Sequence, residues 1–164
     1  MKEITEAEAL KKAASYCSVA ERSAESVRQK VEAYGLEEEA VDRIVERLIQ
    51  DRFVDDKRFA RAFVRDKLIY NKWGKQKISV ELYKKGIASS LRKEVLSEID
   101  EEEYQSVLYA VLETKIKSVK VSDERILYAK LFRFALGRGF ESEHIQRCLK
   151  RLTRYEEDFE EAVE

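Results

Sequence analysis

Proline is absent from this 164-residue sequence, and glycine (five residues), cysteine (two) and histidine (one) are rare. Without proline, nothing forces a helix to break, because every residue keeps the backbone N–H that a helix uses. Charged residues make up 40% of the chain and hydrophobic residues 44%. This composition favours amphipathic helices with one solvated face, so we predict an all-α fold.

Long apolar runs are also missing. No run could span a bilayer, and the N-terminal residues 1–4 lack the apolar stretch of a signal peptide. Cys17 and Cys148 form no CxxC pair, and both occupy apolar positions of predicted helices. We therefore expect small buried hydrophobic cysteines without a disulfide, in a cytoplasmic protein that has no membrane partner.

Patterns for catalysis and metal binding are missing as well. His144 is the only histidine, and no cysteine or carboxylate cluster stands at ligand spacing from it. We expect it to be exposed at a polar helix start. No nucleophile accompanies it, and Gly137–Gly139 is too short to cradle a nucleotide. The sequence therefore predicts no enzyme, no cofactor and no metal site.

Three segments of the chain share one pattern around Gly35, Gly86 and Gly139. An apolar residue follows each glycine, and apolar residues recur eight and four places before it and nine, ten and thirteen places after it. These positions are Val27, Val31, Ile44, Val45 and Leu48; Ile78, Leu82, Val95, Leu96 and Ile99; and Leu131, Ala135, Cys148, Leu149 and Leu152. The spacing predicts a helix ending at a C-cap glycine, followed by a second helix with one buried stripe.

A further apolar helix precedes each of these pairs. We therefore predict nine helices in three tandem three-helix repeats, with boundaries at 1–54, 55–100 and 101–164. A short glycine turn before the last helix of each repeat is typical of helix-turn-helix geometry. We expect few contacts between repeats and hence an elongated, curved crescent.

Polar residues mark several of the helix starts. Thr5 and Glu8 form a possible capping box, and Asp55 or Asp56 precedes the second repeat. Ser89 and Ser142 each stand three residues after a turn glycine.

The net charge of −1 conceals an uneven distribution. Cations gather in residues 55–93, whereas acidic residues gather in 98–103 and in the tail 156–164. We expect this tail to extend the last helix or to fray. Local charge is what a polyanionic partner meets, so the middle of the chain is the candidate binding region.

Arg58, Arg61 and Arg65 follow one another at three- and four-residue intervals and therefore share one helix face. Phe59 and Phe63 fall on the opposite face. Most helical charge runs are ordinary solvated surface. Here few acids stand nearby to pair with the arginines, which favours a binding role.

Residues 71–77 place Trp73 among lysines beside a glycine that we expect to be flexible, Gly74. The lysines could meet phosphates while Trp73 meets a base or a partner's pocket, or Trp73 could simply pack between repeats. The candidate binding surface comprises Arg58, Arg61, Arg65, Lys67, Lys72, Trp73, Lys75, Lys77, Lys84 and Lys85.

These motifs resemble the RecX family, bacterial regulators of the RecA recombinase, over nearly the whole chain. Residues 21–30 (ERSAESVRQK) are similar to the family's opening signature R-S-x-x-E-L-x-x-K-L. Residues 53–60 match the motif hydrophobic-D-D-x-R-F-A, and Lys85-Gly86-Ile87 follows at the expected distance. Residues 130–140 are similar to K-x-x-R-F-L-x-x-R-G-F.

The resemblance implies a nine-helix crescent that lies in the groove of the RecA filament on single-stranded DNA. It implies a non-enzymatic regulator, mostly an inhibitor, of ATP hydrolysis, strand exchange and filament assembly. We expect the chain to be a monomer. DNA repair and the SOS response would be its setting. The candidate binding surface would then contact RecA and DNA.

Two other functions fit the residues. A stand-alone helix-turn-helix-like DNA-binding module would show steep salt dependence on naked DNA, although the net charge argues mildly against it. A helical-repeat scaffold for another protein would retain a partner unrelated to recombination.

Overall fold

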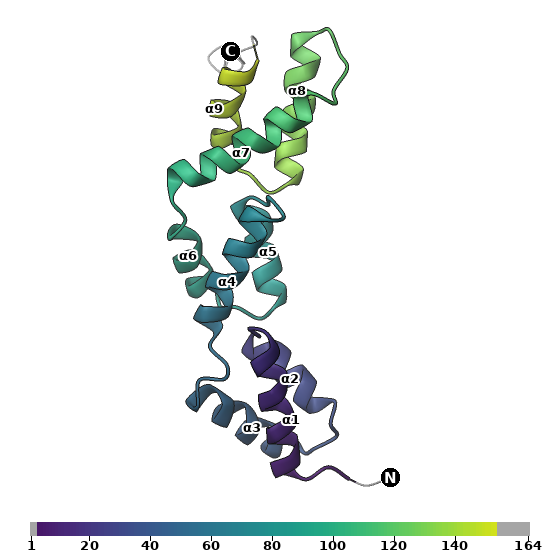
Figure 1. Ribbon diagram of the computed structural model, residues 1–164, viewed down its shortest axis with the longest axis vertical. Helices are drawn as coiled ribbons and strands as arrows, with labels where there is room; N and C mark the ends of the chain where they lie inside the picture. The colour runs from purple at the N-terminus through teal and green to yellow at the C-terminus, as the bar shows by residue number, and fades with distance from the viewer. Residues whose placement is uncertain (1–2, 154–164) are drawn as a thin grey trace, which may run out of the picture. The chain divides into compact units, whose positions relative to one another are not determined.

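The computed structural model, which describes residues 3–153, is all-α (Figure 1). The described residues form nine helices and no strand, which confirms the predicted three-helix repeats. The helices are α1 (Glu6–Val19), α2 (Ala24–Glu32) and α3 (Glu38–Gln50); α4 (Asp56–Ile69), α5 (Lys75–Lys84) and α6 (Ser89–Ser97); α7 (Glu101–Ile116), α8 (Glu124–Gly137) and α9 (Ser142–Leu152). The acidic tail 156–164 lies outside the described residues.

The middle helix of each repeat ends at a left-handed glycine. The φ angles are 85° at Gly35, 80° at Gly86 and 94° at Gly139. Glycine lacks a Cβ and adopts this conformation readily. After α5, the Ile87 N–H donates to the Leu82 carbonyl at 3.1 Å, which closes the turn. The predicted C-cap glycines are confirmed.

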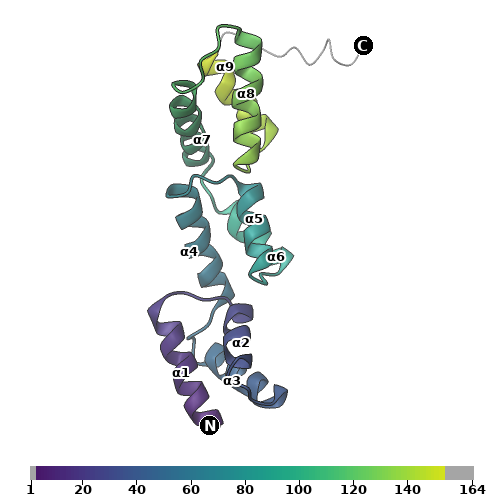
Figure 2. The same ribbon diagram turned by 90° about the vertical axis from the view of Figure 1, so that its right-hand side faces the viewer.

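Most of the predicted core positions are buried, whereas Leu96 and Leu152 are only half-buried. The residues eight and four places before the turn glycines are fully inaccessible to solvent: Val27, Val31, Ile78, Leu82, Leu131 and Ala135. Their spacing places them on one helix face, where they cover the following helix of the repeat. Figure 2 shows α7, α8 and α9 side by side around such a core.

Helix capping agrees with two of the predicted start signals. The Thr5 hydroxyl accepts the Glu8 N–H at 3.2 Å. The Asp55 carboxylate accepts the Lys57 N–H at 3.0 Å, so Asp55 caps α4. At α9, Ser142 is the first helical residue, and the N-cap is Glu141, which makes no side-chain cap hydrogen bond. The Glu141 carboxylate is bound elsewhere, as described below.

The chain forms two compact units, residues 1–65 with 80–97 and residues 66–79 with 98–164, and the middle repeat contributes to both. In the first unit, Asp56 accepts the Ala24 N–H at 2.8 Å. In the second, the Lys75 N–H donates to the Tyr104 hydroxyl at 2.9 Å. These two bonds join adjacent repeats. The boundaries after residues 54 and 100 stay a prediction.

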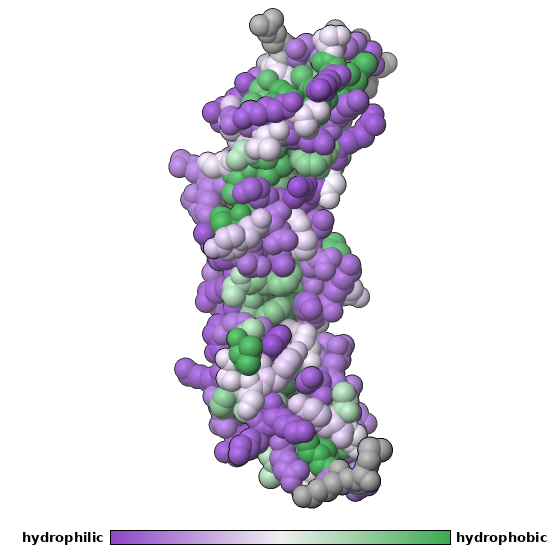
Figure 3. Space-filling model, turned by 45° about the vertical axis from the view of Figure 1, so that its right-hand side comes forward, coloured by the Kyte–Doolittle hydropathy of each residue, from purple (hydrophilic) through white to green (hydrophobic). Residues whose placement is uncertain are grey.

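Both cysteines are buried free thiols, as predicted. Burial raises the pKa of Cys17, and it raises that of Cys148 to about 11. In residues 3–153, no helix is long and apolar enough to cross a membrane. The face in Figure 3 is largely hydrophilic with separate hydrophobic patches, as the high charge content leads one to expect.

Candidate functional site

The structure divides the ten residues of the candidate binding surface equally between the two compact units. The first unit contains Arg58, Arg61, Arg65, Lys84 and Lys85. The second contains Lys67, Lys72, Trp73, Lys75 and Lys77.

The arginine face of α4 is exposed, but its residues have partners. The Arg58 guanidinium donates to the Glu21 carboxylate at 2.7 Å and to the Arg52 carbonyl at 3.0 Å. Arg61 and Arg65 are also exposed, and neither is without a partner. Our expectation that acids to pair with these arginines are scarce was therefore wrong. The acid that pairs with Arg58 lies 37 residues earlier in the chain, where local sequence does not reveal it.

The apolar side of α4 also differs from the prediction. Phe59 and Phe63 are only half-buried, with ring centroids 5.6 Å apart. Ala60, Val64 and Leu68 form the fully buried stripe. Their four-residue spacing keeps them on one helix face. The two phenylalanines therefore flank the buried stripe of α4, and part of each ring remains in contact with solvent.

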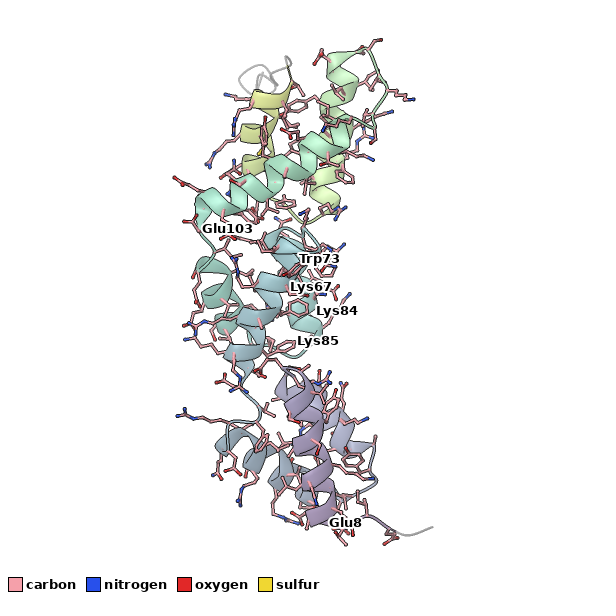
Figure 4. The ribbon with its side chains drawn as sticks, in the orientation of Figure 1. Glu8, Lys67, Trp73, Lys84, Lys85 and Glu103 are labelled. Carbon is pink, nitrogen blue, oxygen red and sulfur yellow. The ribbon has the colours of Figure 1, made fainter. Side chains whose placement is uncertain are left out.

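Trp73 lies between two cations in the connection from α4 to α5. The ammonium of Lys67 lies 5.2 Å from the Trp73 ring centroid and that of Lys77 lies 4.7 Å from it. Figure 4 shows Lys67 beside Trp73. The Trp73 side chain is half-buried, and the backbone N–H of Trp73 donates to the Lys67 carbonyl at 3.0 Å. This arrangement places two positive charges over the indole ring, where the ring quadrupole attracts them.

The connection that carries Trp73 is fixed in place, so the expected flexibility of Gly74 was wrong. Gly74 is buried, and its N–H donates to the Arg138 carbonyl at 2.8 Å. The Gln76 N–H donates to the Gly139 carbonyl at 3.0 Å. The connection between α4 and α5 therefore packs backbone to backbone on the turn between α8 and α9, and this contact positions Trp73.

Lys72 and Lys75 extend this cluster. Lys72 adopts a left-handed conformation with φ of 57°, which is uncommon outside glycine. The ammonium of Lys75 lies 4.9 Å from the centroid of the Tyr104 ring, while its backbone N–H binds the Tyr104 hydroxyl. We call Lys67, Lys72, Trp73, Lys75 and Lys77 the Trp73 cluster.

Lys84 and Lys85 lie at the C-terminus of α5 in the first unit, where Figure 4 labels both. Both are exposed, and the Lys84 ammonium lies 3.1 Å from the Glu81 carboxylate. Cations at a helix C-terminus stabilise the helix by interacting with its dipole, which gives this pair a structural reason of its own. Nearby, the Arg92 guanidinium lies 5.3 Å from the centroid of the exposed Tyr83 ring.

A polar cluster around His144 was missed by the sequence reasoning. His144 is only 14% exposed, and its ring nitrogens lie 2.7 Å from Glu101 and 2.9 Å from Glu141. The buried Tyr104 hydroxyl donates to the Glu141 carboxylate at 3.0 Å. The expectation of an exposed histidine was wrong. The three-residue spacing of Glu141 and His144 could have signalled their pairing, but Tyr104 and Glu101 come from another helix.

The exposed cations and aromatic rings described above can bind a partner, but the described residues offer no set of metal ligands. Among residues 3–153, no group of three or more His, Cys, Asp or Glu side chains could hold a metal ion. Burial raises the pKa of Tyr104 well above its ordinary value, so its hydroxyl stays protonated and donates to Glu141. The polar contacts among Glu101, Tyr104, Glu141 and His144 therefore hold α9 and the start of α5 against α7.

Two family models match the chain: "RecX, second three-helix domain" over residues 55–96 and "RecX, third three-helix domain" over residues 101–149. A regulatory protein RecX of Prosthecochloris aestuarii is 31% identical over 144 residues, which cover 88% of this chain and 93% of the relative. One of Clostridium perfringens is 30% identical over 137 residues, which cover 82% of this chain. The match spans only 64% of the length of that clostridial relative.

Solved structures share the fold. A crystal structure of RecX from Lactobacillus salivarius matches with a TM-score of 0.81 at 21% identity, covering 90% of this chain and 96% of that one. Another crystal structure of a regulatory protein RecX gives the same score, covering 88% and 73%. The helices, the motifs and the matches to family models and relatives lead to one conclusion: the chain belongs to the RecX family of regulatory proteins.

Proposed function

We propose that this chain is a non-enzymatic regulator of the RecA recombinase that acts in the cytoplasm as a monomer. It binds the RecA filament on single-stranded DNA and restrains ATP hydrolysis, strand exchange and filament assembly. The observation that carries the proposal is membership of the RecX family of regulatory proteins. The resemblance described above supplies RecA as the partner.

The geometry supports contact with a polyanionic assembly at two places. In the Trp73 cluster, lysines can meet phosphates while the indole stacks on a base or fills a partner's pocket. On α4, Arg61 and Arg65 are exposed and present fork-shaped donors that suit carboxylates and phosphates. In the filament groove, the chain would use both surfaces on successive RecA protomers.

ATP hydrolysis by RecA on single-stranded DNA tests the function directly. The chain is titrated in at concentrations well below that of RecA. We expect strong suppression at this ratio, because a bound regulator affects a filament of many protomers. An unchanged rate at equimolar protein would contradict the proposal.

Charge reversal tests which surface is used. The variant Arg61→Glu with Arg65→Glu should keep the helical circular dichroism spectrum and lose binding to the filament. Lys11→Glu with Lys12→Glu is a matched control, since it changes the charge equally on exposed residues of α1. If both double variants bind the filament like the unmodified chain, this face of α4 does not make the contact.

A stand-alone DNA-binding module is the second candidate, because helix-turn-helix geometry and cationic surfaces also suit a DNA groove. Binding to naked duplex DNA with steep salt dependence, together with no effect on RecA, would favour it.

A further inference from the structure

A second basic site lies in the third repeat, at the connection between α7 and α8. A pocket of about 550 Å³ opens there, and the candidate binding surface contributes no residue to it. Four cations line this pocket: Lys115, Lys120, Lys130 and Arg133. We call it the α7–α8 pocket.

Helical spacing explains how three side chains converge on the pocket. Lys130, Arg133 and Phe134 stand three and four residues apart on α8 and therefore share one face. Lys115 comes from the last turn of α7, where the helix dipole favours a cation. Lys130 and Arg133 lie within α8 before its last turn, where the helix dipole does not favour a cation. Like charges that neighbour each other on one helix face repel, so a bound anion would relieve a repulsion between Lys130 and Arg133.

Among residues 3–153, the charge in the α7–α8 pocket has no paired carboxylate. None of its lining residues is a carboxylate. Within the part of the chain that the structure describes, no ion pair involves Lys115, Lys120, Lys130 or Arg133. One acid of the connection, Asp123, is used instead as the N-cap of α8, where it accepts the Arg125 N–H at 2.9 Å.

The wall of the pocket also carries an aromatic ring. Phe134 is half-buried, with the Lys115 ammonium 4.7 Å and the Arg138 guanidinium 5.3 Å from its ring centroid. Cations along a groove combined with an aromatic side chain are typical of proteins that bind single-stranded nucleic acid. A carboxylate surface of a protein would use the cations but gain less from the ring.

We propose that the α7–α8 pocket binds the phosphodiester backbone of single-stranded nucleic acid, with Lys130 and Arg133 as the principal phosphate contacts. Both side chains are exposed and reach the pocket from one helix face. The site is independent of the RecA proposal, because it predicts binding to an oligonucleotide in the absence of any other protein.

The test is fluorescence anisotropy of a labelled 20-nucleotide oligo-dT titrated with the full chain at several salt concentrations. Lys130→Glu with Arg133→Glu should weaken binding by at least about tenfold and lower the salt slope by roughly 1.4, since each lost phosphate contact removes about 0.7. The charge-matched control, Lys11→Glu with Lys12→Glu, should change the affinity less than about twofold, because these α1 residues do not line the pocket.

Folding is checked by circular dichroism, and Lys130→Gln with Arg133→Gln gives a milder second variant expected to weaken binding in the same direction. Equal losses in pocket and control variants would overturn the proposal, because they would indicate an effect of net charge alone. Unchanged oligonucleotide binding by the pocket variant would also overturn it. Weakened binding of poly-glutamate by the same variant would then identify an acidic protein surface as the partner.

Discussion

Gly74 and Gly139 approach so closely that a Cβ on Gly74 would lie 2.3 Å from the carbonyl carbon of Gly139. Real Cβ atoms do not come this near to backbone, so only glycine fits at position 74. The contact joins the connection between α4 and α5 to the turn between α8 and α9, within one compact unit. It also holds Trp73, the neighbour of Gly74, in its position between two lysines.

Alanine at position 74 should therefore destabilise the protein. Overpacking typically costs about 1–3 kcal/mol, and a backbone neighbour that cannot rotate away puts Gly74→Ala at the upper end. The matched control is Gly137→Ala, because a Cβ there meets nothing within 4 Å in the last position of α8. Chemical denaturation should show a clear loss for the first variant and no loss for the second. If the Gly74→Ala and Gly137→Ala variants were equally stable, the close contact between Gly74 and Gly139 would be contradicted.

Tyr104→Phe should cost about 1–3 kcal/mol of stability, since it leaves two partly buried polar partners without their hydrogen bonds. The Tyr104 hydroxyl accepts the Lys75 N–H and donates to Glu141. Thermal unfolding of the two proteins at pH 7 measures this difference. A melting temperature equal to that of the unmodified chain would show that water replaces both bonds.

The same tyrosine predicts a pH dependence. Burial, together with the Glu141 carboxylate, raises the pKa of Tyr104 above its ordinary value of about 10. The unfolded chain loses this proton near pH 10, whereas the folded protein keeps it and so binds more protons. The stability from the protonated hydroxyl is therefore present below about pH 10 and is lost as the pH rises further. Between about pH 10 and 11, the Tyr104→Phe variant should therefore lose less stability than the unmodified chain, as measured by denaturation at each pH.

Both thiols should react slowly in the folded protein. The thiolate is the reactive species, and burial raises the pKa of Cys17 and, to about 11, that of Cys148. With Ellman's reagent at pH 8, we expect little colour from native protein and two thiols per chain in guanidinium. Cys17→Ser and Cys148→Ser assign each reaction. Rapid modification of native Cys148 would show that α9 opens easily.

Trp73 is the only tryptophan, so its fluorescence reports on the Trp73 cluster alone. If its indole stacks on a base, oligo-dT should quench the emission, and Trp73→Ala should weaken binding by about tenfold, since stacking contributes about 1–3 kcal/mol per base. Trp73→Phe keeps an aromatic face and should retain most of the affinity. If instead Trp73→Ala lowers the melting temperature and leaves binding unchanged, Trp73 is a packing residue.

Local sequence was sufficient to predict the features that depend on neighbours along the chain. Gly35, Gly86 and Gly139 are predictable as C-caps because a left-handed residue is needed where a helix ends and glycine adopts it readily. Asp55 is predictable as a cap for a similar reason, since its carboxylate reaches an N–H two residues ahead.

Relationships across the chain were not predictable in this way. Glu21 pairs with Arg58 across 37 residues, and the same separation joins Tyr104 to Glu141. Neither pair follows from periodicity, because helix periodicity indicates which face is buried but not which helix covers it. Gly74 resembled a loop glycine for the same reason, and only the turn that packs on it shows why the residue is small.

By itself, therefore, the sequence determined the helices, their buried stripes, their glycine turns and the family, because each depends on spacing along one chain. Only the tertiary structure decided which cations have acidic partners, where Trp73 is held, that His144 is enclosed and that four cations converge on the α7–α8 pocket. The physical reason is that charge pairing, close packing and pocket formation depend on distances through space, which the sequence specifies only once the helices have packed.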